Sequence, residues 1–396
     1  MNKIIAIAVL LAAQPALAMQ NIKLGPVDLN PMVGMKQSYD SNIYLYNGKD
    51  AGKNRRGSLI NRSMAGVNAG VKFGSRLELK GGYTLEALSY NRQPDINNAV
   101  HHLANLALDA KLPRNTTLTF KNDFAQTTDQ ATSQLIERAK RLQNVAAVTV
   151  DSPLRGQFGF GVNVQHTYNN YDSLTYKMLD RQELLSGFNV NYKLQPKTKV
   201  FIGYTYGDLR YADSSGKPGD ATYNNVDLGV TGTLGPKLVG TVTAGTQMRN
   251  YKQAYTVNGV AAADKKTTAS YGAQVQWKPL EKTEVVYYGK RGNVESSYSA
   301  SRYYTSTLND LSASREVNKF KVGVGTSFET VQYPEDTSAT KGKRVDENFN
   351  ARLTVDYSVQ KWLKAGAAYP YKNRASNEKT NNYKDNVIGL ELKGMF

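Results

Sequence analysis

The stretch that decides the fold is Asn386-Val387-Ile388-Gly389-Leu390-Glu391-Leu392-Lys393-Gly394-Met395-Phe396, at the end of the chain. Apolar and polar residues alternate in it: Ile388, Leu390, Leu392 and Phe396 share one face, and Glu391, Lys393 and Met395 share the other. A period of two predicts a β-strand with one apolar face and one polar face. Because a strand at the end of a chain needs a neighbour on its open edge, we expect it to pair with the first strand and close a barrel.

The beginning of the chain has the features of a secretion signal. Met1-Asn2-Lys3 is basic, residues 4–13 are apolar but too short to span a bilayer, and Ala16-Leu17-Ala18 fits a cleavage site. We therefore expect a signal peptide over residues 1–18, a periplasmic N-terminal segment over 19–31 and one outer-membrane β-barrel over 32–396. The alternative, a buried core helix, would have no packing partner in the polar segment that follows.

The composition narrows the class of protein. The 396 residues contain no cysteine, which excludes disulfides, thiolate metal sites and cysteine nucleophiles. After the signal, no stretch approaches the ~18 apolar residues of a membrane-spanning helix. There are 26 Tyr against 2 Trp, and Gly, Asn and Thr are frequent. No Pro/Ser-rich linker divides the chain, so we expect one domain rich in strands and turns.

Short turns recur at a steady interval. Their centres, at Gly74, Pro113, Ser152, Pro196, Gly235 and Pro279, are separated by 39 to 44 residues. Longer polar loops, such as residues 46–56, 211–220 and 251–266, lie between them. Short turns at one end and longer loops at the other are typical of a bacterial outer-membrane barrel. A β-propeller also repeats near this interval, but it needs four short strands per repeat, and each repeat here contains two long ones.

The strands alternate over long distances. In residues 349–359, Phe349, Leu353 and Val359 face one way while Asn350 and Arg352 face the other. Such segments run over about 12 to 16 residues, whereas the strands of soluble sandwiches average roughly 5 or 6. A tilted membrane strand needs ~9–11 residues in the hydrocarbon. Long alternating hairpins therefore favour a membrane barrel.

The number of strands follows from parity. The pattern gives 17 strands, the first over residues 32–46, and an odd number cannot close an antiparallel barrel. The outer loop at residues 334–343 requires the strand before it to run outward, so a strand running inward must precede it. Residues 303–311 are the only candidate. We predict a transmembrane antiparallel β-barrel of about 18 strands, with 16 as the alternative, wide enough for a water-filled lumen.

Aromatic residues cluster where the bilayer interfaces should lie. Near the tight turns are Phe73, Phe120, Phe158, Tyr192, Trp277, Trp362 and Phe396. Near the long loops are Tyr46, Tyr90, Tyr168, Tyr171, Tyr206, Tyr211 and Tyr251. Amphipathic rings settle at headgroup level, so we expect two girdles. The alternative for any single residue is an ordinary strand aromatic.

Strand alternation assigns an excess of basic side chains to the lumen. The whole chain has a formal net charge of +17. The candidates for the substrate path are Arg62, Arg76, Lys80, Lys111, Lys121, Arg155, Lys193, Arg249, Arg291, Lys319, Lys321, Arg352 and Lys364, with Lys72, Lys199 and Lys278 beside them. A lumen lined by one sign of charge concentrates ions of the other sign. The alternative is that these charges pair across strands in an interior that must be polar anyway.

No catalytic or metal centre is apparent. The only histidines are His101, His102 and His166, and the sequence neighbours of the first two offer no Ser or carboxylate in register. A hydrolase on the outer rim stays open as an alternative. Adjacent strand residues point to opposite faces, which argues against a metal held by His101 and His102. We expect no enzyme activity, no cofactor, no metal and no nucleic acid as a partner.

Three short motifs carry a resemblance to a known family. They are Gly34-Met35-Lys36-Gln37-Ser38-Tyr39-Asp40-Ser41-Asn42-Ile43-Tyr44, Tyr192-Lys193-Leu194-Gln195-Pro196-Lys197-Thr198, and Ala367-Ala368-Tyr369-Pro370-Tyr371-Lys372-Asn373-Arg374. The chain resembles the "putative β-barrel porin 2" family, which includes outer-membrane barrels of exopolysaccharide clusters. The resemblance implies export of a polysaccharide across the outer membrane, a periplasmic polysaccharide-export partner and no enzyme activity.

Two functions from different classes remain. The first is a wide, basic channel for export of an anionic exopolysaccharide, and the second is a general or anion-selective diffusion porin. A structural or adhesive barrel is disfavoured by the modest loops. None of the loops is long enough to fold inward as a constriction, so we expect either an open pore or a plug formed by residues 20–31 or a partner protein. Pro370, inside the penultimate strand, predicts a bulge or bend.

Overall fold

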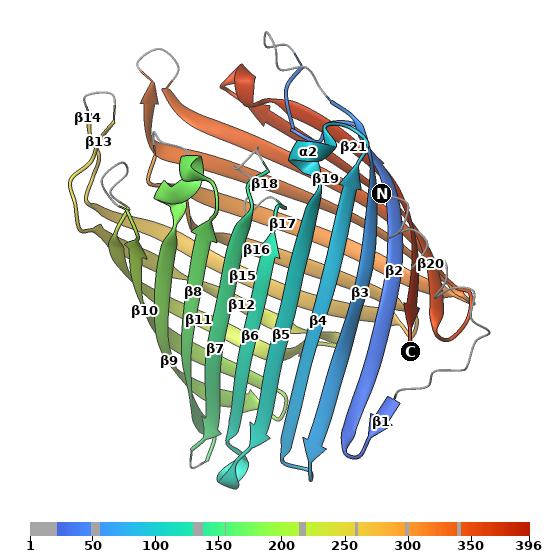
Figure 1. Ribbon diagram of the computed structural model, residues 1–396. Coiled ribbons are helices and arrows are strands. Elements are labelled where there is room, and N and C mark those ends of the chain that lie inside the picture. Colours follow the sequence, from blue (N-terminus) through green and yellow to red (C-terminus); the bar gives the residue numbers. More distant parts are fainter. Residues whose placement is uncertain are drawn as a thin grey trace.

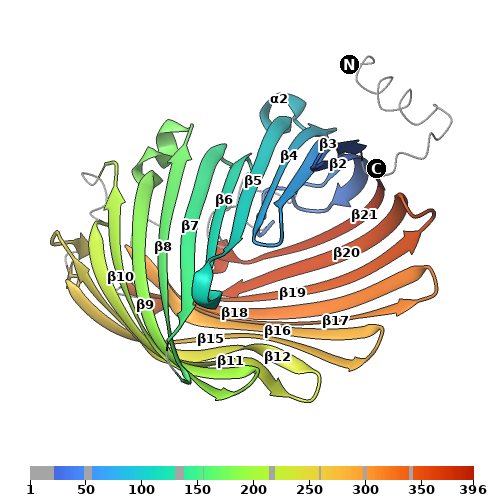
Figure 2. The same ribbon diagram turned by 90° about the horizontal axis from the view of Figure 1, so that it is seen from below.

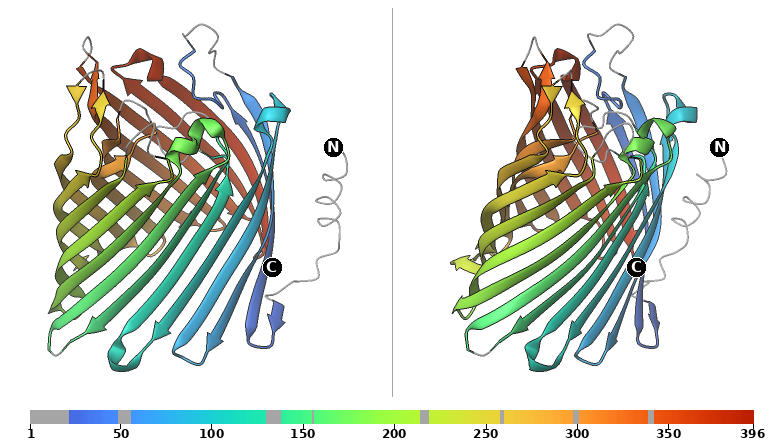
Figure 3. Two further views of the ribbon diagram at one scale, coloured as in Figure 1. Left: turned by 60° about the vertical axis from the view of Figure 1, so that its left-hand side comes forward. Right: turned by 90° about the vertical axis from the view of Figure 1, so that its left-hand side faces the viewer.

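The protein folds into a closed antiparallel barrel of eighteen strands (Figure 1). The computed structural model describes residues 22–48, 56–129, 138–154, 156–213, 219–257, 260–297, 301–338 and 342–396. Tight turns lie at the lower end in Figure 1 and the longer connections at the upper end. Figure 3 shows that the strands are strongly tilted against the barrel axis, as closure of a barrel requires. No helix in the described ranges is long and apolar enough to cross a membrane.

Each barrel strand pairs with its neighbours in chain order. The strands are β2 (Val27–Asp40), β3 (Ser58–Phe73), β4 (Leu77–Tyr90), β5 (Ala99–Lys111), β6 (Thr117–Thr127), β7 (Arg141–Pro153), β8 (Phe158–Tyr171), β9 (Arg181–Gln195), β10 (Thr198–Tyr211), β11 (Ala221–Gly235), β12 (Leu238–Tyr251), β15 (Lys265–Leu280), β16 (Thr283–Glu295), β17 (Tyr303–Val317), β18 (Phe320–Ser338), β19 (Gly342–Ser358), β20 (Leu363–Ser376) and β21 (Tyr383–Met395).

The first and last strands close the barrel, as the sequence predicts. Residues Met32 to Asp40 of β2 pair antiparallel with Val387 to Met395 of β21. Figure 2, seen from the tight-turn end, shows these two strands side by side on a continuous wall. The predicted strand over residues 303–311 is confirmed as part of β17, so parity gave the right count.

A short hairpin precedes the closure and corrects the predicted N-terminal segment. Strand β1 (Ile22–Leu24) pairs with the beginning of β2, with Ile22 opposite Leu29 and Leu24 opposite Val27. The other edge of β2 is occupied by β3 over its whole length. Residues 22–31 are therefore part of the wall and do not plug the lumen, and β2 begins at Val27 and not at residue 32.

Pro31 lies between the two partners that share this edge of β2. Its carbonyl oxygen accepts a hydrogen bond of 2.9 Å from the backbone N–H of Phe396. In an antiparallel strand the N–H and C=O of one residue point to the same side, so the position of the missing N–H of proline faces the carboxyl group of Phe396, where the ladder with β21 ends. A proline here forgoes only the last hydrogen bond of that ladder.

The burial pattern is inverted relative to a soluble protein. The apolar residues of β21 are among the most exposed on the molecule, with Ile388, Leu390 and Leu392 exposed by 59%, 64% and 50%. Val67 on β3, Ile202 on β10 and similar residues continue this apolar outer surface around the barrel. Cross-strand partners share a face. The ladder pairs therefore show, strand by strand from β21 onward, which side chains lie on the outer surface and which lie on the inner wall.

Two local predictions are wrong. Residues 334–343 are not simply an outer loop, because β18 and β19 extend their pairing to Ser338 and Gly342. Pro370 makes no bulge: it faces Arg352 in an unshifted ladder with β19. On the other side, the ladder with β21 keeps one register on either side of Tyr369 and Pro370, where two pairs are missing. The missing donor interrupts the ladder without displacing it.

The connections at the loop end contain small elements: helix α2 (Pro94–Asn97), the 3-10 helices η2 (Leu174–Leu179) and η3 (Lys379–Asn381), and the hairpin of β13 (Thr256–Val257) and β14 (Val260–Ala261). The 3-10 helix η1 (Pro113–Asn115) forms one of the tight turns.

Candidate functional site

The tight turns form a ring of positive charge around one mouth of the barrel. Eight turns connect consecutive barrel strands at this end, and each contains a Lys or Arg in its sequence. These residues are Arg76, Arg114, Arg155, Lys197, Lys237, Lys282, Lys319 and Lys361. Glu281 is the only acidic residue in the same turns. In outer-membrane barrels the short turns face the periplasm, so this turn ring surrounds the periplasmic mouth.

A belt of lysines continues the positive charge onto the inner wall just inside this mouth. The lysine belt consists of Lys72, Lys80, Lys111, Lys121, Lys193, Lys199, Lys278, Lys321 and Lys364. The ladders place lysines opposite each other: Lys193 faces Lys199 within the belt, and Lys364 faces Lys393 on β21. Like charges placed opposite each other repel, so an arrangement of this kind favours the presence of an anion.

The lysine belt is open to solvent and only partly neutralised. The side chains of Lys72, Lys80 and Lys278 are exposed by 73%, 57% and 59%, and each lies within 4.0 Å of a glutamate. The other six members form no ion pair within 4.0 Å in the part of the chain that the structure describes. Carboxylates do share this half of the inner wall, among them Glu78, Asp109, Asp123, Asp151, Asp227, Glu284, Glu316, Asp356 and Glu391.

The loop end of the lumen has the opposite character. Many of its cations are arginines, and each is held by an ion pair, a hydrogen bond or a tyrosine ring. This arginine layer consists of Arg62, Arg141, Arg249, Arg302, Arg344 and Arg374. Arg302, Arg249 and Arg374 are exposed by only 0%, 2% and 2%. Between the two ends, Arg352 forms a bidentate pair with Asp310, with both N–O distances 2.7 Å.

One cluster of the arginine layer joins strands that are far apart in the wall. Arg249 on β12 forms a buried ion pair with Glu295 on β16. Tyr211 on β10 donates a hydrogen bond of 3.0 Å to the same carboxylate. Strands β10 and β16 are four positions apart in the sheet. The ladder between β15 and β16 ends at Arg291, so these side chains connect strand ends that backbone pairing no longer joins.

A glycine makes room for the aromatic floor of this cluster. The ring of Tyr223 lies 5.0 Å below the Arg249 guanidinium and packs over Gly207 on the neighbouring strand. A Cβ at position 207 would come within 2.3 Å of the ring. Any larger residue at this position would displace Tyr223 and the cation above it.

Arg302 joins three loop-end connections. Its backbone N–H and guanidinium donate to the carboxylate of Glu335, with distances from 2.7 to 2.9 Å. The guanidinium also donates to the carbonyl oxygens of Gln253 and Ala263, at 3.3 and 3.0 Å. It lies 3.8 Å from the ring of Tyr251 and 5.4 Å from that of Tyr255. Burial, followed by the charge of Glu335, raises the pKa of Tyr255.

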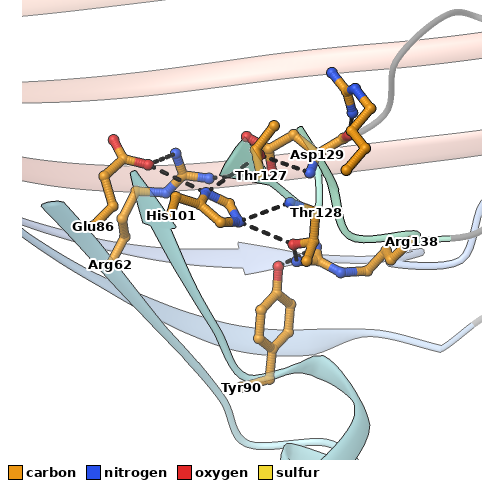
Figure 4. A network of polar contacts seen from close by, with 9 residues as sticks. Arg62, Glu86, Tyr90, His101, Thr127, Thr128, Asp129 and Arg138 are labelled. Carbon is orange, nitrogen blue, oxygen red and sulfur yellow. Dashed lines mark hydrogen bonds and ion pairs between the residues drawn. The ribbon is translucent and has the colours of Figure 1, made fainter. Parts of the chain in front are cut away.

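A second polar network lies on the other side of the loop end (Figure 4). Arg62 and His101 both contact Glu86, at 2.9 and 3.4 Å. The backbone N–H of Thr128 donates to His101 Nε2 at 3.1 Å, so the ring proton belongs on Nδ1, facing Glu86. The Thr128 hydroxyl lies 3.0 Å from the same Nε2. The sequence neighbours of His101 gave no sign of this hydroxyl–imidazole–carboxylate row, because its parts come from β4, β5 and the connection after β6.

The network in Figure 4 fixes the connection after β6, and its geometry does not activate the Thr128 hydroxyl as a nucleophile. His101 is 1% exposed, and its Nε2 already accepts from a backbone amide. Arg138 donates to the Thr128 hydroxyl at 2.7 Å and lies 4.5 Å above the ring of Tyr90. No group of three or more His, Asp or Glu side chains that could hold a metal occurs in the described ranges.

The residues named from the sequence fall into four groups. On the inner wall are Arg62, Lys80, Lys111, Lys121, Lys193, Arg249, Lys321, Arg352 and Lys364. Arg76 and Lys319 lie in the turn ring and not on a strand. Arg155 lies outside the described residues. Arg291 differs from the expectation: it pairs with Tyr271 and Thr307 on the face that carries the exposed Trp277 and Leu311, which is the outer surface.

The aromatics near the tight turns lie on the outer surface at that end of the barrel, and their place at the bilayer interface stays a prediction. Phe73, Phe158, Tyr192 and Trp277 are exposed on the outer surface. Phe120 shares this face through its pairing with Val148. Trp362 and Phe396 stack with their ring centroids 5.4 Å apart.

The second proposed girdle is mostly wrong. Tyr168 and Tyr206 are exposed on the outer surface, but Tyr90, Tyr171, Tyr211 and Tyr251 are buried within the barrel. Sequence reasoning also passed over several inner-wall and mouth cations: Lys36, Lys290 and most of the turn ring. The signal for the turn ring was present, because each cation directly adjoins a predicted turn.

The barrel fold, with the turn ring at one mouth and the arginine layer at the other, defines a porin-like channel of the bacterial outer membrane. A family model described as "Putative beta-barrel porin 2" matches residues 15–396. The chain belongs to this family, and it is an integral outer-membrane protein. The resemblance seen in the sequence motifs is thereby confirmed.

Solved structures support the fold. A BenF-like porin from Pseudomonas fluorescens Pf-5 is similar with a TM-score of 0.51 and 10% identity, over 94% of this chain and 100% of that one. The outer membrane protein opdK from Pseudomonas aeruginosa has a TM-score of 0.51 and 7% identity, over 93% of this chain and 99% of that one. At this identity the likeness concerns the fold alone. No curated protein sequence matches.

Proposed function

We propose that this channel exports an anionic exopolysaccharide, which enters at the turn ring and passes the lysine belt. The observation that carries the proposal is that all eight tight turns between barrel strands contain a Lys or Arg. A polymer approaching from the periplasm would meet these charges first. Their summed field raises the local concentration of polyanion at the mouth.

The choice of lysine over arginine near the mouth supports the passage of a polymer through the channel. Lysine ammonium groups on flexible stems contact an anion as point charges, whereas arginines hold carboxylates in fixed bidentate geometry. The solvent-exposed cations near the mouth are largely lysines, and the fixed arginines lie at the other end. Weak, repeated contacts of this kind allow a polymer to bind and also to leave.

The second candidate is an anion-selective diffusion porin. It is favoured by the membership of a porin family and by the 18-strand barrel, a size class that encloses an aqueous channel. Both candidates predict anion selectivity, so selectivity alone does not distinguish them. They differ in whether a long polyanion engages the channel from one side.

The distinguishing experiment is single-channel recording in a planar bilayer with oriented insertion. Polygalacturonate, an anionic polysaccharide, is added to one side at a time, and neutral dextran of the same length serves as the comparison. We expect polygalacturonate to interrupt the current from the turn-ring side at much lower concentration than from the loop side. Equal block from both sides, or equal block by dextran, contradicts polymer capture and leaves the diffusion porin.

Matched variants test the charges. The quadruple change Lys197→Gln, Lys237→Gln, Lys282→Gln and Lys361→Gln removes half of the turn ring. The control replaces loop-end lysines, Lys140→Gln, Lys177→Gln and Lys379→Gln. We expect only the first set to raise the concentration of polygalacturonate needed for block. In cells, loss of the gene should abolish surface polysaccharide and leave small-solute uptake unchanged.

The proposal includes no catalytic step. Both nitrogens of the His101 imidazole are engaged, by Thr128 and Glu86, which supports a structural part for the network in Figure 4. A periplasmic polysaccharide-export protein would be the partner that delivers the polymer to the turn ring. Co-purification of such a protein with the intact channel, lost in the quadruple variant, would support this part of the proposal.

A further inference from the structure

The closing seam between β2 and β21 ends, at the loop side, in two carboxyl groups. Asp40 is the last residue of β2 and pairs with Val387, and Asp385 lies on β21 two residues before Val387. The two groups repel each other directly, and Asp40 is half-buried while Asp385 is only 1% exposed. Two negative charges placed together away from water are unstable unless a proton or a cation neutralises them.

The hydrogen bonds around the pair favour its ionised form. The backbone N–H of Asn42 donates to Asp40 Oδ1 at 2.8 Å. The hydroxyl of Ser41 donates to Asp385 Oδ1 at 3.2 Å. Bonds of this kind favour the charged form of a carboxyl group, whereas burial and a second carboxyl group nearby oppose it. Asp385 Oδ2 is buried and has no hydrogen-bond partner. It is an orphaned acceptor beside a second carboxylate.

The neighbouring cations do not account for the pair. Lys372 on β20 is the cation that faces it: it pairs with Asp385 in the ladder and attracts Asp40. Within the described ranges, no ion pair of 4.0 Å or less joins Lys372 to either carboxylate. Even at full strength, one ammonium group would leave one of the two negative charges without a partner.

The backbone around the pair is held rigidly. Ser41 N–H donates to Asn386 O at 2.9 Å, and Asn386 N–H donates to Ser41 Oγ at 2.8 Å. The side chain of Asn42, which is fully buried, donates to Lys384 O at 2.9 Å. These bonds fix the positions of both carboxylates, so a cation would find its ligands already in place. Preorganisation of this kind lowers the cost of binding.

We propose that Asp40 and Asp385 bind a divalent cation, Ca²⁺, that joins the first and last strands of the barrel. Hard cations take oxygen ligands, and Ca²⁺ accepts irregular sets of 6–8 oxygens that include waters. Two protein carboxylates supply only a few of these ligands, and water on the exposed side of the half-buried Asp40 would supply others, which predicts weak affinity. This site is independent of what passes through the lumen.

The test uses the full-length barrel in detergent after treatment with EDTA. Binding is measured by Tb³⁺ luminescence and its displacement by Ca²⁺, and stability by the temperature at which the folded barrel is lost, with and without Ca²⁺. We expect Ca²⁺ to displace Tb³⁺ and to raise the unfolding temperature of the wild type. Mg²⁺, which demands near-octahedral geometry, should have a smaller effect.

The variants are Asp385→Asn and Asp40→Asn, and the matched control is Glu391→Gln on the same strand. Each Asp variant should lose the response to Ca²⁺ and, in EDTA, equal or exceed the wild type in stability because the repulsion is relieved. The control should respond like the wild type. If Asp385→Asn does not fold, Asp40→Asn and the Tb³⁺ measurement on the wild type still show whether the two carboxylates bind the cation.

Two results would overturn the proposal. One is a wild-type unfolding temperature that rises on acidification but is identical with Ca²⁺ and EDTA, which would mean that the carboxyl groups share a proton. The other is Tb³⁺ binding that persists in both Asp variants, which would place the cation elsewhere on the barrel.

Discussion

The ion pair between Arg249 and Glu295 offers a quantitative test of the loop-end cluster. In the variant Glu295→Gln the shape of the side chain is kept, but Arg249 loses its opposite charge in a site where it is 2% exposed. Removing one partner of a buried pair costs about 3 to 5 kcal/mol, since the other charge stays buried without compensation. The bond from Tyr211 to the same carboxylate is weakened as well. We therefore expect a loss in this range in the free energy of unfolding.

The assay is equilibrium urea unfolding in phospholipid vesicles, followed by the fluorescence of Trp277 and Trp362. The double variant Arg249→Met, Glu295→Gln removes both charges, and replacing a buried pair by uncharged side chains is often nearly neutral. It should recover most of the lost stability. The control is Glu78→Gln, whose contact with Lys72 at 3.7 Å involves a side chain that is 73% exposed. There we expect a change of about 0 to 1 kcal/mol.

Either of two results would contradict the expected role of the buried charges. A loss below about 1 kcal/mol for Glu295→Gln would show that the arginine is solvated or finds another carboxylate, as surface pairs do. A double variant as unstable as the single one would show that packing, and not charge, holds the cluster together.

Three further predictions concern the loop end and the seam. Arg302→Ala should leave the barrel folded but make the loops around Gln253 and Glu335 susceptible to limited proteolysis, because it removes the donor that joins them; unchanged cleavage would contradict this. His101→Ala should expose the connection after Thr127 to protease in the same way, and cleavage equal to that of the wild type would exclude the clamp. Phe396→Ala removes the ring stacked on Trp362 and should slow barrel assembly in vesicles, measured by gel mobility of unheated samples, whereas Met395→Ala should not.

The membrane barrel could be predicted from the sequence because bilayer and closure impose regular constraints. Alternation along β21 gave its outer surface, and antiparallel parity required the strand within β17, whose own pattern is weak. The turns were found because Pro and Gly mark them. These signals are local or arithmetic, and no knowledge of distant contacts is needed to use them.

The features that sequence reasoning missed depend on distant contacts or ambiguous patterns. Arg249 and Glu295 are 46 residues apart, and nothing in either segment announces the other. Arg291 follows the run Val285-Val286-Tyr287-Tyr288, in which both faces are apolar, so alternation does not fix its direction. Above the hydrocarbon both faces of a strand contact polar surroundings, and for this reason buried tyrosines such as Tyr211 were assigned to the outer girdle.

The placement of β1 has a consequence for how the barrel reaches its correct shear. Strand β21 runs down the free edge of β2 until Phe396 bonds to Pro31, and β1 occupies the same edge from Leu29 onward. A β21 that slipped downward by two residues, the smallest shift that keeps its faces correct, would collide with Ile22. The β1–β2 hairpin thus blocks this shift sterically, and the register of the last strand is set by the hairpin at the beginning of the barrel.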